Sequence, residues 1–186
     1  MKMTGVLFFI LFLLTGCSDA PKEIERGMAL RSSILQGNGC RFDVKVTADY
    51  VDYVESFAAC CEGNAKGTIS FTVTAPEQIS GITGKVSEEE GMLTFDGMAL
   101  QFDKMAENRV TPVSAPWIFL KTLRGGYIRS GCMEGEFLRL TLDDSFEEDA
   151  LQLDVWIDSS DAPIRAEILW NGRKILSLDI ENFLVL

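Results

Sequence analysis

The sequence contains no histidine among its 186 residues, and this absence narrows the chemistry that the protein can perform. Without an imidazole there can be no Ser–His or Cys–His pair and no histidine-bearing metal site. Paired carboxylates could still serve glycoside hydrolysis, but the spacing of the acidic residues marks out no particular pair. The sequence therefore predicts a protein that is not an enzyme, with a hydrolase using paired acids as an alternative of a different class.

Positive charge is also scarce, because 17 Lys and Arg residues stand against 28 Asp and Glu residues, giving a formal net charge of −11. Such a surface repels phosphate backbones, so the sequence predicts no nucleic-acid partner. It equally disfavours attraction to an anionic bilayer, so attachment to a membrane must come from a lipid.

Long apolar runs are absent as well. The longest, residues 6–14, has nine residues, whereas a membrane-spanning helix needs about 20. The run follows the positive charge of Lys2 and ends in Leu14-Thr15-Gly16-Cys17. A short apolar run with a charged start and small residues at its end is typical of a secretory signal peptide.

The tetrapeptide Leu14-Thr15-Gly16-Cys17 resembles the bacterial lipobox, in which the cysteine receives a diacylglyceryl group before the leader is removed. The resemblance implies a signal peptide over residues 1–16, a lipid on Cys17 and a polar tether over 17–23. It implies covalent diacylglycerol on Cys17 and no other cofactor. Two acyl chains suffice for stable membrane attachment. The alternative is an ordinary secretory leader with a chance cysteine.

Helical periodicity occurs in two places. Apolar residues recur every three to four positions over 24–35, which predicts an amphipathic helix that ends at Gly37-Asn38-Gly39. A second helix is predicted after Ser114 as its N-cap, with a left-handed stop at Gly125-Gly126.

Elsewhere the period is two, which is typical of half-buried strands. Strands are predicted at residues 42–47, 53–61, 68–73, 79–86, 92–102, 137–142, 151–157, 164–170 and 175–183. Asn171-Gly172 is the strongest hairpin signal. Strands with short connections indicate an antiparallel meander, and such a long sheet must curl. The predicted fold is mainly antiparallel β, a single half-barrel domain over 24–186 whose two helices cover the concave face.

The C-terminal part of the sequence resembles the LolA/LolB superfamily of lipoprotein localisation factors. The resemblance lies in the ordered motifs Asp154-Val155-Trp156-Ile157-Asp158, Pro163-Ile164-Arg165, Asn171-Gly172-Arg173 and Asn182-Phe183, and in a strand over 67–76 that opens with Gly and closes at Pro. It implies a half-barrel fold. Similarity to lipid-anchored members from spore-forming Gram-positive bacteria implies action by protein contact on the outer face of the cell membrane. The predicted anchor departs from LolA itself, which is soluble.

Four cysteines remain in the predicted mature chain besides Cys17, namely Cys40, Cys60, Cys61 and Cys132. If the turn after residue 49 is centred near residue 51, Cys40 and Cys61 oppose each other and could form a disulfide. Free thiols in a reducing envelope are the alternative. A zinc site is disfavoured because adjacent strand residues point to opposite faces. Acidic runs at 88–90, 143–144 and 147–149 are predicted to be solvated turns, so no metal site is expected.

Large apolar side chains could line a pocket under the helices or form the core instead. The candidates for a cavity lining are Met98, Phe102, Trp117, Leu120, Trp156 and Trp170. The sequence thus supports a membrane-anchored, non-catalytic binding factor with a protein partner in the envelope, related to the cell wall or to sporulation. The alternative is a carrier or receptor for lipid or lipoprotein acyl chains in a concave apolar cavity.

Overall fold

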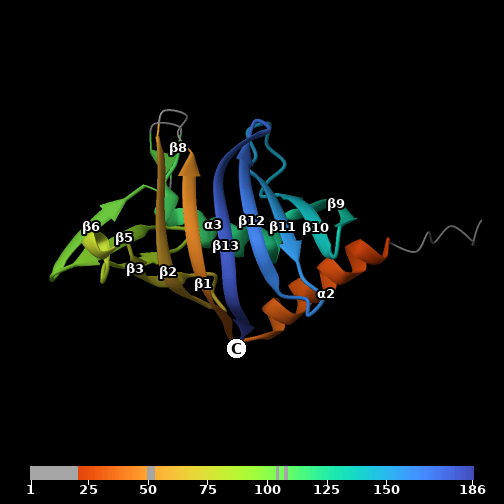
Figure 1. Cartoon of the computed structure of the whole chain (residues 1–186), viewed down its shortest axis with the longest axis horizontal. Coiled ribbons are helices and arrows are strands. Elements are labelled where there is room, and N and C mark those ends of the chain that lie inside the picture. Colours follow the sequence, from red (N-terminus) through yellow and green to blue (C-terminus); the bar gives the residue numbers. More distant parts are fainter. Residues whose placement is uncertain (1–20, 50–52, 104, 107–108) are drawn as a thin grey trace, which may run out of the picture.

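The computed structural model describes residues 21–49, 53–103, 105–106 and 109–186 (Figure 1). The predicted signal peptide, Cys17 and most of the predicted tether lie outside these residues and stay predictions. The predicted tether extended to residue 23, but the first described helix, α2 (Lys22–Gln36), already includes residues 22 and 23. Pro21 precedes it at the N-cap position, with φ −51° and ψ 138°.

One antiparallel sheet of 11 strands dominates the fold, in the order β6-β5-β4-β3-β2-β1-β13-β12-β11-β10-β9. Its strands are β1 (Gly39–Asp49), β2 (Val54–Asn64), β3 (Ile69–Ala75), β4 (Thr83–Val86), β5 (Gly91–Phe95), β6 (Met98–Phe102), β9 (Tyr127–Glu134), β10 (Phe137–Asp143), β11 (Gln152–Ile157), β12 (Pro163–Trp170) and β13 (Arg173–Val185). A separate pair is formed by β7 (Met105–Ala106) and β8 (Arg109–Val110), and short 3₁₀ turns are η2 (Glu77–Ile79) and η3 (Pro112–Ser114). The predicted fold class, an open curved antiparallel sheet with helices, is confirmed.

Within the described residues, the helices α2 and α3 (Ala115–Gly125) lie on the same face of the sheet (Figure 1). Helix α2 approaches β10 closely at Gly27, where a Cβ atom would come within 2.6 Å of a Leu140 methyl group. The Arg31 guanidinium then joins the helices by donating to the carbonyls of Leu123 at 2.9 Å and Gly126 at 2.7 Å. These bonds satisfy carbonyls at the end of α3 that have no partner within the helix.

The ends of α3 differ in detail from the prediction. Ser114 stands at the N-cap position, but its hydroxyl donates to the Thr111 carbonyl at 2.7 Å, and its side chain makes no cap bond to the helix. Gly126 has φ −70° and ψ 166°, which is extended backbone, so the predicted left-handed stop is wrong. The helix ends here because the chain turns directly into β9.

Two hairpin turns adopt the left-handed backbone that a tight β-turn requires. Asn171 and Gly172 have φ values of 49° and 73°, which confirms the predicted hairpin between β12 and β13. Asp96 and Gly97 have φ values of 47° and 75° and divide residues 92–102 into β5 and β6, so the prediction of one continuous strand there is wrong. Strand β9 was not predicted, and the predicted strand 79–86 is shortened to β4 by the η2 turn.

Candidate functional site

The space between α3 and the sheet is occupied by aromatic and aliphatic side chains. Phe119 projects from α3 and meets Phe42 of β1 edge-to-face, with ring centroids 5.6 Å apart, and Phe183 of β13 at 6.4 Å. Phe42 and Phe183 stack at 5.9 Å. Beside them Leu120 is buried over Gly63 of β2, where a Cβ would come within 2.4 Å of a Leu120 methyl group. The helix is therefore seated directly on the sheet here.

Four of the six candidate cavity residues lie on the core side or at its margin. Trp117 and Leu120 are buried in α3, and the Trp117 indole donates to the Gly67 carbonyl at 3.1 Å. Phe102 and Trp170 are half-buried and pack against the edge of the core. These side chains contribute to packing, and the structure brings only Trp117 and Leu120 together in one element.

The other two candidates lie elsewhere. Met98 is 70% exposed at the tip of the β5–β6 hairpin. Trp156 belongs to the face of the sheet opposite α3, since its strand neighbours Val155 and Ile157 are the ones directed into the core. Trp156 is nevertheless only 8% exposed, because two guanidinium groups cover its ring.

Those guanidinium groups form a ladder on the outer face of the sheet with Trp156. Arg139 of β10 and Arg165 of β12 lie 5.2 and 5.0 Å from the Trp156 ring centre. Arg139 also donates at 2.6 Å to Asp154, whose carboxylate is buried and receives a further bond from Thr141 at 2.8 Å. The hydrogen bond with Asp154 is the main cause of a raised pKa of Arg139. Arg165 pairs with Glu167 as Arg139 pairs with Asp154, so both guanidinium groups of the ladder have a carboxylate partner.

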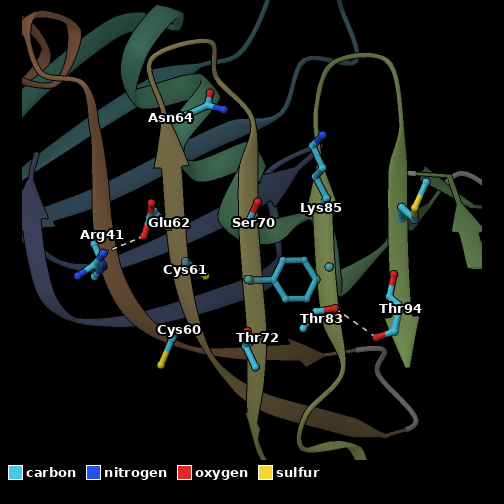
Figure 2. A pocket seen from close by; sticks show the side chains of 13 residues that line it. Arg41, Cys60, Cys61, Glu62, Asn64, Ser70, Thr72, Thr83, Lys85 and Thr94 are labelled. Atoms are coloured by element: carbon cyan, nitrogen blue, oxygen red, sulfur yellow. Dashed lines mark hydrogen bonds and ion pairs between the residues drawn. The ribbon is translucent and has the colours of Figure 1, made fainter. Parts of the chain in front are cut away.

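Further along the same outer face, strands β1–β5 form an open cleft of about 730 Å³ (Figure 2). Hydroxyl groups line it in rows across the strands: Ser70, Thr72, Thr83 and Thr94. The Arg41–Glu62 ion pair, 2.9 Å long, and Lys85 stand at its sides. These residues were not among the predicted site residues, although the polar half of each alternating strand pattern marks them. The cleft offers hydroxyl and charged groups that can form hydrogen bonds with a ligand.

The cysteines divide between the two faces of β1 and β2. Cys40 lies opposite Gly63 and Cys61 lies opposite Phe42 in the paired strands. The prediction that Cys40 lies directly opposite Cys61 is therefore wrong by two positions. All four described cysteines are free thiols. Burial raises the pKa of Cys40 to about 11 and that of Cys61 further still, so both stay protonated at neutral pH. Protonated thiols are poor nucleophiles, which disfavours their oxidation to a disulfide.

Cys60 is exposed and lies on the outer face between the cleft and Asp43. A hydrogen bond to the Asp43 carboxylate raises the pKa of the Cys60 thiol, and Asn182 holds that carboxylate from the other side at 2.8 Å. The two hydrogen bonds lower the pKa of Asp43. Cys60 is thus an accessible thiol in its unreactive form, unlike a catalytic cysteine, whose pKa is lowered.

Replacing Asp43 by Asn should therefore increase the reactivity of Cys60. Without the carboxylate, the pKa of the thiol falls toward its ordinary value, and a larger thiolate fraction at pH 8 speeds alkylation by iodoacetamide several-fold. Peptide mass spectrometry follows Cys60 and Cys132 separately, and Cys132 serves as the internal control because it lies on a distant strand. Equal rates at Cys60 in the wild-type and D43N proteins would contradict this assignment.

No group of three or more Cys, Asp or Glu side chains in the described part of the chain is arranged to hold a metal ion. Over the same residues, no helix is both long and apolar enough to cross a membrane. What the described surface offers is a hydroxyl-lined cleft, a paired Arg–Trp ladder and an exposed apolar hairpin.

The described residues form an open, curved antiparallel sheet with two helices on one face, which is the half-barrel architecture that the sequence predicts. Among solved structures the chain is similar to a LolA superfamily protein from Nitrosomonas europaea, with 6% identity and a TM-score of 0.44 over 86% of this chain and 93% of that one.

Two further similar structures are lipoproteins or complexes of one. Lipoprotein LppX of Mycobacterium tuberculosis shares 15% identity, with a TM-score of 0.41 over 87% of this chain and 93% of that chain. A chain in the structure of the CwlD amidase from Clostridioides difficile in complex with the GerS lipoprotein shares 10% identity, with a TM-score of 0.46 over 93% of this chain and 100% of that chain. No protein-family model matches the sequence, and no curated protein matches it significantly.

Proposed function

We propose that this protein is a lipid-anchored, non-catalytic binding factor on the outer face of the cell membrane, and that its partner is another protein of the envelope. The proposal joins the lipobox-like Leu14-Thr15-Gly16-Cys17 to a domain whose surface features suit binding. The hydrogen bond with Asp43 raises the pKa of the accessible Cys60 thiol, which supports a role without covalent catalysis.

The observation that carries the proposal is the filled space beneath α3. An acyl carrier of this shape needs an apolar cavity between helix and sheet, because ligand sites bury most of the surface of a small ligand. Here Phe42, Phe119 and Phe183 meet in that space, and Leu120 closes on Gly63. A binding role then falls to the outside of the domain, where a protein partner is the suitable class of ligand.

Affinity purification from detergent-solubilised membranes tests this function. The full chain, tagged at its C-terminus, should recover one envelope protein in near-stoichiometric amount, while membranes containing an unrelated tagged lipoprotein should not. Recovery of the bait without a stoichiometric partner, over a range of mild detergents, would overturn the proposal.

Native mass spectrometry of the same preparation separates the carrier hypothesis from the proposed function. The mature protein should appear at its own mass plus the covalent anchor, because Phe42, Phe119 and Phe183 meet in the described space beneath α3 where an acyl chain would lie. A second, non-covalently retained acyl species would instead favour the carrier.

A further inference from the structure

An open sheet ends in two edge strands, here β6 and β9, and the two edges differ in how they are protected. Strand β9 carries Arg129 and Glu134, and α2 packs against it with Glu23 close to Gly131. Strand β6 reads Met-Ala-Leu-Gln-Phe and has neither a charge nor a proline. Natural edge strands usually carry such features because an unprotected edge pairs with other chains.

The side chains beside this edge are apolar and accessible. Met98 and Leu100 of β6 are 70% and 65% exposed, and Phe95 of β5 is 50% exposed. The register places Leu100 opposite Leu93, which packs against the core, and Met98 opposite Phe95. These apolar side chains of β5 and β6 thus continue the helix-bearing face of the sheet outward, as far as the tip of the β5–β6 hairpin.

The backbone of β6 is also free to bind on its outer side. A two-residue turn at Asp96-Gly97 closes on a hydrogen-bonded pair, Phe95 with Met98. Hydrogen-bonded and non-hydrogen-bonded pairs alternate in antiparallel strands, so the N–H and C=O groups of Ala99 and Gln101 point away from β5. No strand among the described residues pairs with them.

Charge indicates what kind of strand fits this edge. Acidic residues flank β6 at both ends, Asp96 in the turn and Asp103 directly after the strand, and both are exposed. The whole chain is strongly acidic. A second copy of β6 would bring the same acidic ends to the edge, whereas a segment with basic ends would be attracted to them.

Figure 1 adds the position of the edge in the molecule. Strand β6 lies at one end of the long axis, and α2 begins at the opposite end. Helix α2 begins at Lys22, five residues after Cys17, so a lipid on Cys17 would hold the α2 end of the domain near the bilayer and leave β6 at the far end. The edge is therefore placed to meet a protein in the envelope rather than the membrane to which the chain is attached.

We propose that the outer edge of β6 binds an extended segment of a partner protein, with alternating apolar residues and basic ends, which adds to the sheet as a further strand. Strand addition of this kind takes affinity from the main chain and specificity from alternate side chains. The inference rests on the proposed function and specifies where and how the partner binds.

The test uses the mature lipidated protein in detergent and a fluorescent synthetic peptide, KKVTVTVKK. The peptide should bind saturably by fluorescence anisotropy. Leu100→Asp should weaken binding at least about tenfold, which is roughly 1.4 kcal/mol. Ala99→Pro, which removes an outward N–H, should do the same, and the acidic-ended peptide EEVTVTVEE should bind at least about tenfold more weakly.

The matched control is Met133→Asp, because Met133 is a 50% exposed residue on the opposite edge strand. It should leave peptide binding unchanged, and thermal unfolding of each variant should match the wild type. Failure of KKVTVTVKK to bind, equal weakening by Met133→Asp, or equal binding of EEVTVTVEE would overturn the assignment. A concentration-dependent dimer in sedimentation that Leu100→Asp abolishes would assign the edge to a second copy and overturn it too.

The outcome is separable from that of the proposed function. If affinity purification recovers a stoichiometric partner with both the wild-type and Leu100→Asp chains, the protein-binding function stands and the β6 site is wrong. If the Leu100→Asp chain loses that partner while Met133→Asp retains it, the β6 site is supported.

Discussion

Replacing Cys17 by Ser is expected to move the protein from the membrane fraction to the soluble fraction. The hydroxyl cannot form the thioether to diacylglycerol, and each buried methylene of the lost chains contributes about 0.8 kcal/mol to membrane attachment. No helix of the described residues is able to span the bilayer, and the formal net charge of −11 over the full sequence gives the chain no attraction to anionic lipid. Fractionation after a high-salt wash, together with labelled palmitate incorporation, measures the change.

Cys60→Ser is the control for this experiment, because Cys60 lies in a strand of the folded domain. That variant should stay in the membrane fraction and keep its palmitate label. A Cys17→Ser chain that still incorporates palmitate would contradict the lipobox interpretation and remove the basis for placing the protein at a membrane.

Replacing Phe119 by Ala should lower the free energy of unfolding by about 3–5 kcal/mol, the range typical of truncating a buried aromatic side chain. Phe119 is fully buried and contacts both Phe42 and Phe183. The truncation removes these contacts and leaves a cavity that the rigid sheet on one side cannot close. Guanidinium denaturation followed by circular dichroism provides the measurement.

Leu100→Ala is a suitable comparison, because Leu100 is largely exposed and its truncation should change stability by less than about 0.5 kcal/mol. A loss below about 1 kcal/mol for Phe119→Ala would mean that the space beneath α3 is loosely filled. The observation behind the proposed function would then fail, and an acyl ligand in that space would become the better explanation.

The sequence predicted the fold class because alternation and turn chemistry act locally. Asn171-Gly172 was recognised as a hairpin since both residues adopt positive φ there. Asp96-Gly97 carries the same signal, but apolar residues continue on both sides of it, and residues 92–102 were interpreted as one strand. Strand β9 was missed for a different reason. It is an edge strand exposed over most of its length, so its sequence lacks the alternation that burial of one face imposes.

The candidate site was harder to predict because it depends on contacts between distant strands. The two-residue alternation of a strand would by itself have placed the Trp156 side chain on the other face of the sheet from Val155 and Ile157, and so outside the space under α3. That it is buried there depends on Arg139 and Arg165, which lie on the two neighbouring strands. The pairing of Cys40 depends on the centre of the turn after β1, and moving that centre by one residue moves every partner by two.

The bonds from Arg31 to the end of α3, with the close contact of Gly27 on Leu140, have a mechanical consequence. Because α2 is fixed to both the helix and the sheet, it cannot swing as a separate arm. With Cys17 lipidated, residues 17–21 connect the lipid to α2 and can span no more than about 3.6 Å each. The domain would then lie close to the bilayer with a restricted range of tilt. A force applied at the β6 end would be transmitted to the lipid anchor through α2.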